Sequence, residues 1–308
     1  MPSNTLTRQL TDRTPVALPT PPQLPAQVRD TDAHLTAALE RIQQMRDAGR
    51  TLRDIGQLTG TSTTTISDLV NGNHAKVGAG VRRKIYNAFH LTDLAWPTYH
   101  TDNIGQLTEL FDKARHHRLL VGLTARTGSG KTVACEYYTQ LRPNTFYVRC
   151  DPFMSERDLL AAIQEAMGTT YTGRMSVRLR RIAERLTTLD SAMLILDEFS
   201  EVRNPVYRAM ASIVKLTEHN CAVAIVGTEY VSTNIATGTR LQYRGFAEIA
   251  RRLRGCWEEL GSPSRNDVDT ICDHQGIRDA ALRKKLYKAP DMDYLRKTIL
   301  AHHQQAAA

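Results

Sequence analysis

The chain has few cysteines and no close pair among them. Five cysteines occur in 308 residues, and their scatter fits neither a zinc knuckle nor a disulfide framework. Apolar runs are short: "MLIL" and "AVAIV" fall far below the ~20 residues of a membrane-spanning helix. No charged-then-apolar leader opens the sequence. These absences predict a soluble protein of a reducing, cytoplasmic compartment, with no membrane partner.

Acidic residues are outnumbered by basic ones. Forty Lys and Arg against 32 Asp and Glu leave a formal net charge of +8. Such an excess favours a polyanionic partner, nucleic acid first. A chain of this length is also long enough for two folded units.

Composition and apolar spacing divide the chain into five segments. Residues 1–30 are proline-rich without apolar periodicity, which predicts a disordered tail acting as a tether. Residues 31–93 have helical spacing, and 94–104 form a predicted linker. Strands and helices alternate over 105–262, whereas 263–308 is helical throughout. This order predicts an α/β core, a parallel sheet with helices on both faces, preceded by an all-α domain and followed by a small helical lid.

The stretch "TLRDIGQLTGTSTTTISDLVNG" (51–72) has helix-turn-helix spacing. Gly56 lies four residues before the turn glycine Gly60, and Ile66 lies six after it, so two short helices can cross closely. The predicted second helix has no Arg or Lys to hold a guanine or a phosphate. This favours weak or non-specific DNA contact. A small helical domain that docks onto another protein is the alternative.

The stretch "ARTGSGKT" (125–132) lies between a predicted strand and a predicted helix. In that context consecutive backbone N–H groups and a helix N-terminus hold a polyphosphate. Lys131 is predicted to contact the β- and γ-phosphates of ATP, and Thr132 to take a place on Mg²⁺. The first position of this motif, where glycine is usual, is occupied by Ala125. The predicted nucleotide contacts are Thr127, Gly128, Ser129, Gly130, Lys131, Thr132 and Val133.

Two later strand ends supply candidates for hydrolysis. Four apolar residues precede Asp197 and Glu198, so this acid pair is expected at the carboxyl end of a central strand, where open α/β sheets bind ligands. Asp197 is predicted to hold Mg²⁺ through water, and Glu198 to orient and deprotonate the attacking water. Thr228 ends the next strand and is expected to position that water.

Three arginines are candidates for contact with the γ-phosphate. "FAEIARRL" (246–253) contains Arg251 and Arg252, and either is a candidate to reach the nucleotide of a neighbouring subunit. Arg296, in the predicted lid, is a candidate to close over the phosphates of its own subunit. An exposed basic helix face is the alternative interpretation of the adjacent pair.

A further basic run, "GRMSVRLRRIAERL" (173–186), contains one acid, Glu184. Arginines recur at i, i+4, i+7 and i+11, hence on one helix face. Contact with DNA phosphates and an ordinary solvated face are the two interpretations. The four predicted DNA-binding residues are Arg174, Arg178, Arg181 and Arg185.

The order of these motifs resembles the AAA+ ATPases of DNA transposition, with the phage Mu B target-capture family as the best match. The resemblance covers about residues 35–300. It implies ATP-dependent, largely sequence-nonspecific binding to double-stranded DNA by a homo-oligomer, a helical filament or a ring. It also implies delivery of target DNA to a DDE-type transposase and stimulation of strand transfer, in a bacterial or phage-infected cell. In the family pattern Thr228 falls where relatives often have Asn, and Arg252 aligns better than Arg251 with the intersubunit arginine.

Two other functions stay open at this point. One is a helicase-loader-like ATPase of the same fold, whose partner is a replicative helicase. The other is a transcriptional regulator that senses ATP and recognises an operator through the helix-turn-helix. The lack of basic residues on the predicted recognition helix argues against the regulator.

Overall fold

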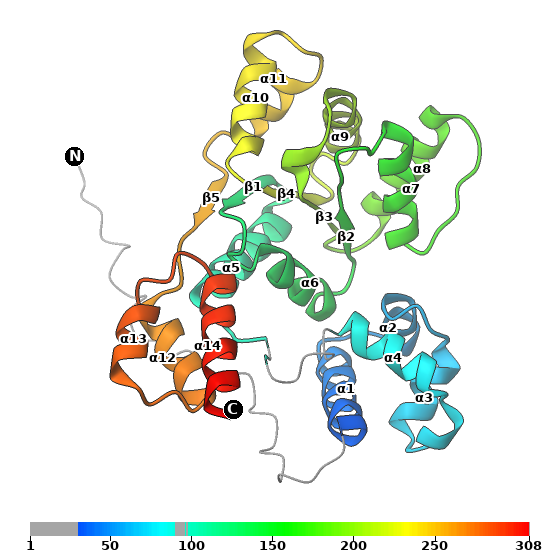
Figure 1. Ribbon diagram of the computed structural model, residues 1–308. Coiled ribbons are helices and arrows are strands. Elements are labelled where there is room, and N and C mark those ends of the chain that lie inside the picture. The colour runs from blue at the N-terminus through cyan, green and yellow to red at the C-terminus, as the bar shows by residue number, and fades with distance from the viewer. Residues whose placement is uncertain (1–29, 90–95, 97, 308) are drawn as a thin grey trace, which may run out of the picture.

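A computed structural model describes residues 30–89, 96 and 98–307 (Figure 1). The predicted tail, except its last residue, and residues 90–95 and 97 of the region around the predicted linker lie outside this description. The centre is a five-stranded parallel sheet in the order β2-β3-β4-β1-β5. Its strands are β1 Leu120–Ala125, β2 Thr145–Arg149, β3 Met193–Asp197, β4 Ala222–Gly227 and β5 Trp257–Leu260. The predicted parallel sheet is confirmed.

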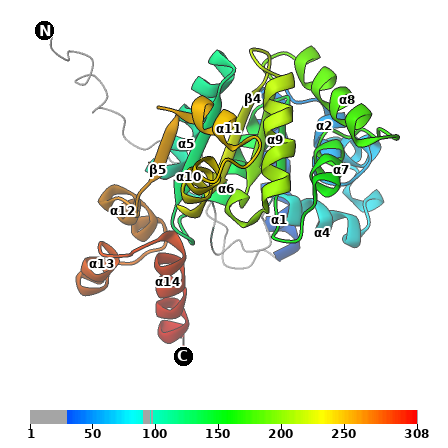
Figure 2. The ribbon, with the colours of Figure 1, turned by 90° about the horizontal axis from the view of Figure 1, so that it is seen from above.

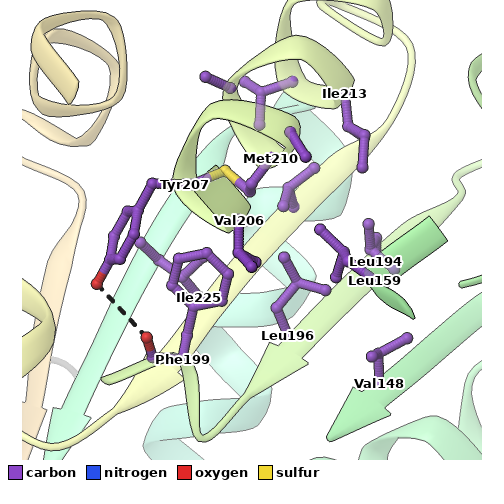
Figure 3. Close-up of a cluster of buried hydrophobic side chains, with 14 of the residues drawn as sticks. Val148, Leu159, Leu194, Leu196, Phe199, Val206, Tyr207, Met210, Ile213 and Ile225 are labelled. Carbon is purple, nitrogen blue, oxygen red and sulfur yellow. Dashed lines mark hydrogen bonds between the residues drawn. The ribbon is translucent and has the colours of Figure 1, made fainter. Parts of the chain in front are cut away.

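Helices cover both faces of this sheet. One face carries α5 (Asp102–His117) and α6 (Lys131–Leu141); the other carries α7 (Glu156–Ala166), α8 (Met175–Thr188), α9 (Asn204–Leu216), α10 (Tyr230–Arg240) and α11 (Phe246–Leu253). Strand β3 shows why the sequence contains unbroken apolar runs: Met193 and Ile195 pack toward the first group, Leu194 and Leu196 toward the second. Figure 3 shows the second cluster, in which side chains of α9 lie over β3 and β4.

The N-terminal helices lie beside the β2 edge of the sheet (Figures 1 and 2). They are α1 Asp30–Asp47, α2 Leu52–Leu58, α3 Thr63–Val70, the 3₁₀ turn η1 His74–Lys76 and α4 Ala79–Ala88. A Cβ on Gly56 would lie 2.9 Å from the carbonyl oxygen of Thr61, and Gly60 has φ +62°, so both glycines are needed where α2 meets α3. Two short helices joined by a tight turn thus occupy this segment. Its assignment as a helix-turn-helix domain stays a prediction.

Two half-buried arginines attach these helices to the end of α6. Arg50 donates to the carbonyl oxygens of Gln140 (3.0 Å) and Arg142 (2.7 Å), and Arg41 Nε donates to Gln140 Oε1 (2.7 Å). Burial lowers the pKa of Arg50 to about 10. Beside this contact a cleft of about 1200 Å³ separates α2 from the outer edge of β2 and the ends of α7 and α8.

The C-terminal helices lie beside the opposite edge, next to β5 (Figure 2). They are α12 Arg265–His274, α13 Ala280–Leu286 and α14 Met292–Ala307, so turns interrupt the segment that the sequence predicts as continuously helical. Helix α5 begins at Asp102, inside the predicted linker, because the Thr101 side chain caps it by accepting from Ile104 N. The backbone N–H of Asp102 also donates to Asp267 of α12 (2.9 Å). The domain boundaries themselves stay predictions.

Candidate nucleotide-binding and hydrolysis site

The turn between β1 and α6 has the backbone of a phosphate-binding loop. Gly128 (φ +82°) and Gly130 (φ +90°) both occupy the left-handed region that favours glycine, and α6 begins directly afterwards. Ala125, by contrast, is the last residue of β1, pairs with Leu260 and is buried in the core. Its methyl group therefore packs within the sheet, away from the turn, which explains why alanine is tolerated at the first position.

Lys131 reaches back across the turn. Its Nζ donates to the carbonyl oxygens of Ala125 (3.0 Å) and Arg126 (2.9 Å). Burial lowers the pKa of Lys131, and the carboxylates of Glu198 and Asp197 oppose that shift. The ammonium group thus lies against the phosphate loop, with the acid pair close enough to affect it.

The remaining predicted loop contacts are placed along the same turn. Thr127 and Val133 are exposed, and Ser129 is buried. Within the described part of the chain, Ser129 Oγ is buried without a hydrogen-bond partner. An orphaned hydroxyl inside such a turn is a donor that an oxygen-rich ligand can use.

The acid pair meets the loop at the carboxyl end of β3. Asp197 is fully buried, and its Oδ2 accepts a hydrogen bond from Thr132 Oγ1 (2.7 Å). Its Oδ1 accepts from the backbone N–H of Glu198 (2.8 Å). Thr132 and Asp197, predicted as metal ligands from positions far apart in the sequence, are brought together. A hydroxyl and a carboxylate are hard oxygen donors that fit Mg²⁺.

Glu198 has a strained backbone. Its φ of +54° puts a non-glycine residue in the left-handed region, where strain often marks functional positions. The side chain is partly exposed, and Arg149 of β2 lies 3.9 Å from its carboxylate. The carboxylate of Glu198 is thus accessible to solvent at the carboxyl end of β3, and its charge affects Lys131 of the loop.

Thr228 follows β4 at the same edge of the sheet. Among the described residues its Oγ1 is buried and unpartnered, while its backbone N–H is 3.5 Å from Ser200 Oγ. Ser200 belongs to the 3₁₀ turn η2 (Phe199–Glu201), which directly follows Glu198. The hydroxyl predicted to position water is thus placed beside the acid pair with its hydrogen-bonding capacity unused.

Helix α14 contacts the phosphate loop directly. The backbone N–H groups of Met292 (3.0 Å) and Asp293 (3.2 Å) donate to the carbonyl oxygen of Gly128. A Cβ on Gly128 would also lie 3.0 Å from Asp291 Oδ1, so this close approach and the positive φ both favour glycine. Arg296 lies one turn further along α14 and is partly buried. The C-terminal helices therefore contact the loop through their backbone, while the contact of Arg296 with the phosphates stays a prediction.

The two adjacent arginines of α11 have different surroundings. Arg252 is 13% exposed and binds both carboxylate oxygens of Glu218 (2.5 and 2.7 Å) as well as Glu248 (2.8 Å). Hydrogen bonds from Arg252 lower the pKa of Glu218. Arg251 is 62% exposed and has one carboxylate partner, Glu248, at 3.2 Å. Of the pair, Arg251 therefore has the more exposed guanidinium and fewer partners.

The arginines of the predicted DNA face also differ. Arg181 and Arg185 are exposed on α8, and Arg174 is exposed at its N-cap. Arg178 is partly buried and donates to Gln164 Oε1 of α7 (2.8 Å). Three of the four predicted DNA contacts therefore face solvent, and the fourth is used between helices.

Sequence reasoning missed one residue at the centre of the site. Tyr147, on β2, donates its hydroxyl to Asp197 Oδ2 (2.9 Å). Burial, and then the charge of Asp197, raise the pKa of Tyr147 well above its usual value. The sequence does place Tyr147 near the carboxyl end of a predicted strand, where site residues are expected. That position does not indicate which carboxylate the tyrosine contacts.

The acid pair lies at the end of β3, which β4 separates from β1 in the sheet. Together with the β1–loop–α6 unit, this arrangement defines a P-loop NTPase fold. Residues 114–234 match the family model described as "AAA domain", in agreement with an AAA-type P-loop fold for this segment. No curated protein sequence matches the chain significantly. Within the described residues no helix has the length and apolar character needed to cross a membrane.

Several solved structures are distantly similar to this chain. NtrX from Brucella abortus in complex with ATP shares 13% identity, with 76% of this chain and 57% of that chain covered and a TM-score of 0.43. A RuvB variant of Thermotoga maritima shares 15%, covering 65% and 68%, with a TM-score of 0.35. Drosophila ORC bound to GC-rich DNA and Cdc6 shares 10%, covering 51% and 56%, with a TM-score of 0.34. TM-scores this low support no conclusion about the function of this chain.

Proposed function

We propose that this chain is an ATPase that binds ATP and Mg²⁺ at the β1–α6 loop and uses hydrolysis to control its binding to DNA. The observation that carries the proposal is the hydrogen bond from Thr132, in the loop, to Asp197, at the end of β3. Such a bond places the metal-binding hydroxyl beside the acid pair. Mg²⁺, when bound, would neutralise charge on the β- and γ-phosphates.

The residues around this bond have separate roles in the proposal. The loop N–H groups and Lys131 hold the phosphates, while Thr132 and Asp197 hold Mg²⁺. Glu198 takes a proton from the attacking water, and Thr228 orients that water. Arg296, on the helix that contacts the loop, reaches the phosphates from within the subunit.

For the partner, we propose double-stranded DNA bound without sequence preference, and a DDE-type transposase to which that DNA is delivered. The net charge of +8 and the exposed arginines of α8 support DNA, and the motif order supports a role in transposition. A homo-oligomer on DNA would add the contacts of many subunits, so affinity would increase without sequence readout.

The test of this function compares random duplexes with and without ATP. The proposal expects ATP to promote binding to all sequences equally and expects strand transfer by a DDE-type transposase to increase when the protein is added. Binding confined to one operator would favour the regulator instead. ATP-dependent loading of a helicase without any effect on strand transfer would favour the helicase loader.

The exposed arginines of α8 give a prediction about salt dependence. Changing Arg181 and Arg185 together to Ala should weaken binding equally for all duplexes and reduce the slope of log K against log salt by ~0.9 for each lost phosphate contact. Arg178→Ala is the matched control, because Arg178 is already bonded to Gln164 and should leave the slope unchanged. Equal slopes for the double variant and the wild type would make α8 an ordinary solvated face.

The pair on α11 gives a prediction about the subunit interface. Arg251→Ala should bind ATP normally but hydrolyse it ~10³-fold more slowly if this arginine acts on the neighbouring nucleotide. Mixing Arg251→Ala with Lys131→Ala should restore part of the activity, since some interfaces then combine an intact arginine with an intact loop. Arg252→Ala should instead lower the melting temperature, because Glu218 and Glu248 lose their shared partner. Recovery in mixtures made with Arg252→Ala, and none with Arg251→Ala, would reverse this assignment.

A further inference from the structure

Strand β2 holds the catalytic end of β3 at two points. The backbone N–H of Cys150, just after β2, donates to the carbonyl oxygen of Asp197 (2.8 Å). The hydroxyl of Tyr147 donates to the side chain of the same residue, at Oδ2 (2.9 Å). Both the main chain and the carboxylate of Asp197 are thus fixed from a strand that contributes nothing to the phosphate loop.

The carboxylate of Asp197 needs such support because it is fully buried. A buried charge is costly unless its oxygens accept hydrogen bonds. Glu198 N satisfies Oδ1, whereas Oδ2 is shared between Thr132 and Tyr147. Of the two donors to Oδ2, the Thr132 hydroxyl also has to face the metal, so Tyr147 is the donor that holds Oδ2 independently of the ligand.

We propose that Tyr147 is a positioning residue for the Mg²⁺ site. Its hydroxyl holds the Asp197 carboxylate in the orientation in which Oδ2 faces Thr132, and so prepares the two metal-holding oxygens before Mg²⁺ arrives. The inference rests on the proposed ATPase function. Tyr147 touches neither nucleotide nor water in this proposal and acts only through Asp197. Outer hydrogen bonds of this kind typically change metal affinity by ~10- to 100-fold.

The variant Tyr147→Phe, made in the full chain, tests this positioning role. It removes only the hydroxyl and keeps the ring that packs against the core between the sheet, α5 and α6. The measurement is the Mg²⁺ concentration that gives half-maximal enhancement in the binding of a fluorescent ATP analogue. We expect that concentration to rise ~10-fold. Binding of the analogue in EDTA should be unchanged, and hydrolysis at saturating Mg²⁺ should approach the wild-type rate.

Tyr138→Phe is the matched control. Tyr138 of α6 is buried and, like Tyr147, donates to a carboxylate, but its acceptor is Asp112 Oδ1 of α5 (2.8 Å) and not a residue of the acid pair. Its Mg²⁺ dependence should equal that of the wild type. An unchanged Mg²⁺ dependence in Tyr147→Phe, or the same shift in both variants, would overturn the role of Tyr147. If the wild-type protein binds no nucleotide, the proposed ATPase function is wrong, and this inference fails with it.

Discussion

Lys131→Ala is expected to abolish nucleotide binding at concentrations that saturate the wild type, without unfolding the protein. The ammonium group of Lys131 lies against the loop, and its partners there are backbone carbonyls. Hydrogen bonds to charged groups contribute roughly 1.5–3 kcal/mol each. Loss of two such bonds to phosphate oxygens should therefore weaken ATP binding by at least ~10²-fold. Calorimetric titration with ATP and Mg²⁺ measures the change.

A lysine on the same domain provides the control for this variant. Lys113 of α5 is exposed and pairs with Glu109 on its own helix. Lys113→Ala removes the same charge. Both ATP affinity and ATP-dependent DNA binding should be unchanged in this variant. Wild-type affinity in Lys131→Ala, with a normal melting temperature, would contradict the assignment of the loop. Equal losses in both variants would point to net charge, and not to the loop, as the cause.

The parts of the fold that the sequence predicts well depend on neighbours in the chain. The run before Asp197 is buried on both faces of the sheet, so every residue is apolar and the strand is visible without its partners. The glycines of the phosphate loop are required by their own backbone angles. Helix, turn and strand signals of this kind are local, which is why the order of elements and the position of the loop follow from the sequence.

The parts that the sequence does not predict depend on pairs far apart in the chain. Tyr147 meets Asp197 only because β2 and β3 are adjacent in the sheet. Arg252 is held by Glu218, from the turn after α9, which no helical spacing could indicate. The sequence likewise does not separate the partly buried Arg178 from the exposed Arg181, because helical periodicity places both on one face. Tertiary partners therefore decide which of several similar side chains is available for function.

The second large effect is expected for Glu198→Gln. The side-chain carboxylate of Asp197 keeps all three of its hydrogen-bond donors in this variant, since Glu198 supplies one through its backbone N–H. The loop and the metal-holding oxygens should therefore bind ATP as in the wild type. Only the proton acceptor for the attacking water is lost, and loss of a general base typically costs ~10² to 10⁴ in rate. Steady-state hydrolysis and nucleotide affinity, measured on the same preparation, separate the two effects.

The same variant tests whether hydrolysis drives release from DNA. If ATP promotes assembly on DNA and hydrolysis ends it, Glu198→Gln should stay bound after dilution into buffer without free nucleotide, while the wild type dissociates as its ATP is consumed. Glu201→Gln, an exposed residue of η2 three positions further on, removes the same charge and should dissociate like the wild type. Equal lifetimes for Glu198→Gln and wild type, with hydrolysis absent in the variant, would mean that release is independent of hydrolysis. A long lifetime in Glu198→Gln alone would instead assign the timing of release to one carboxylate on one strained turn.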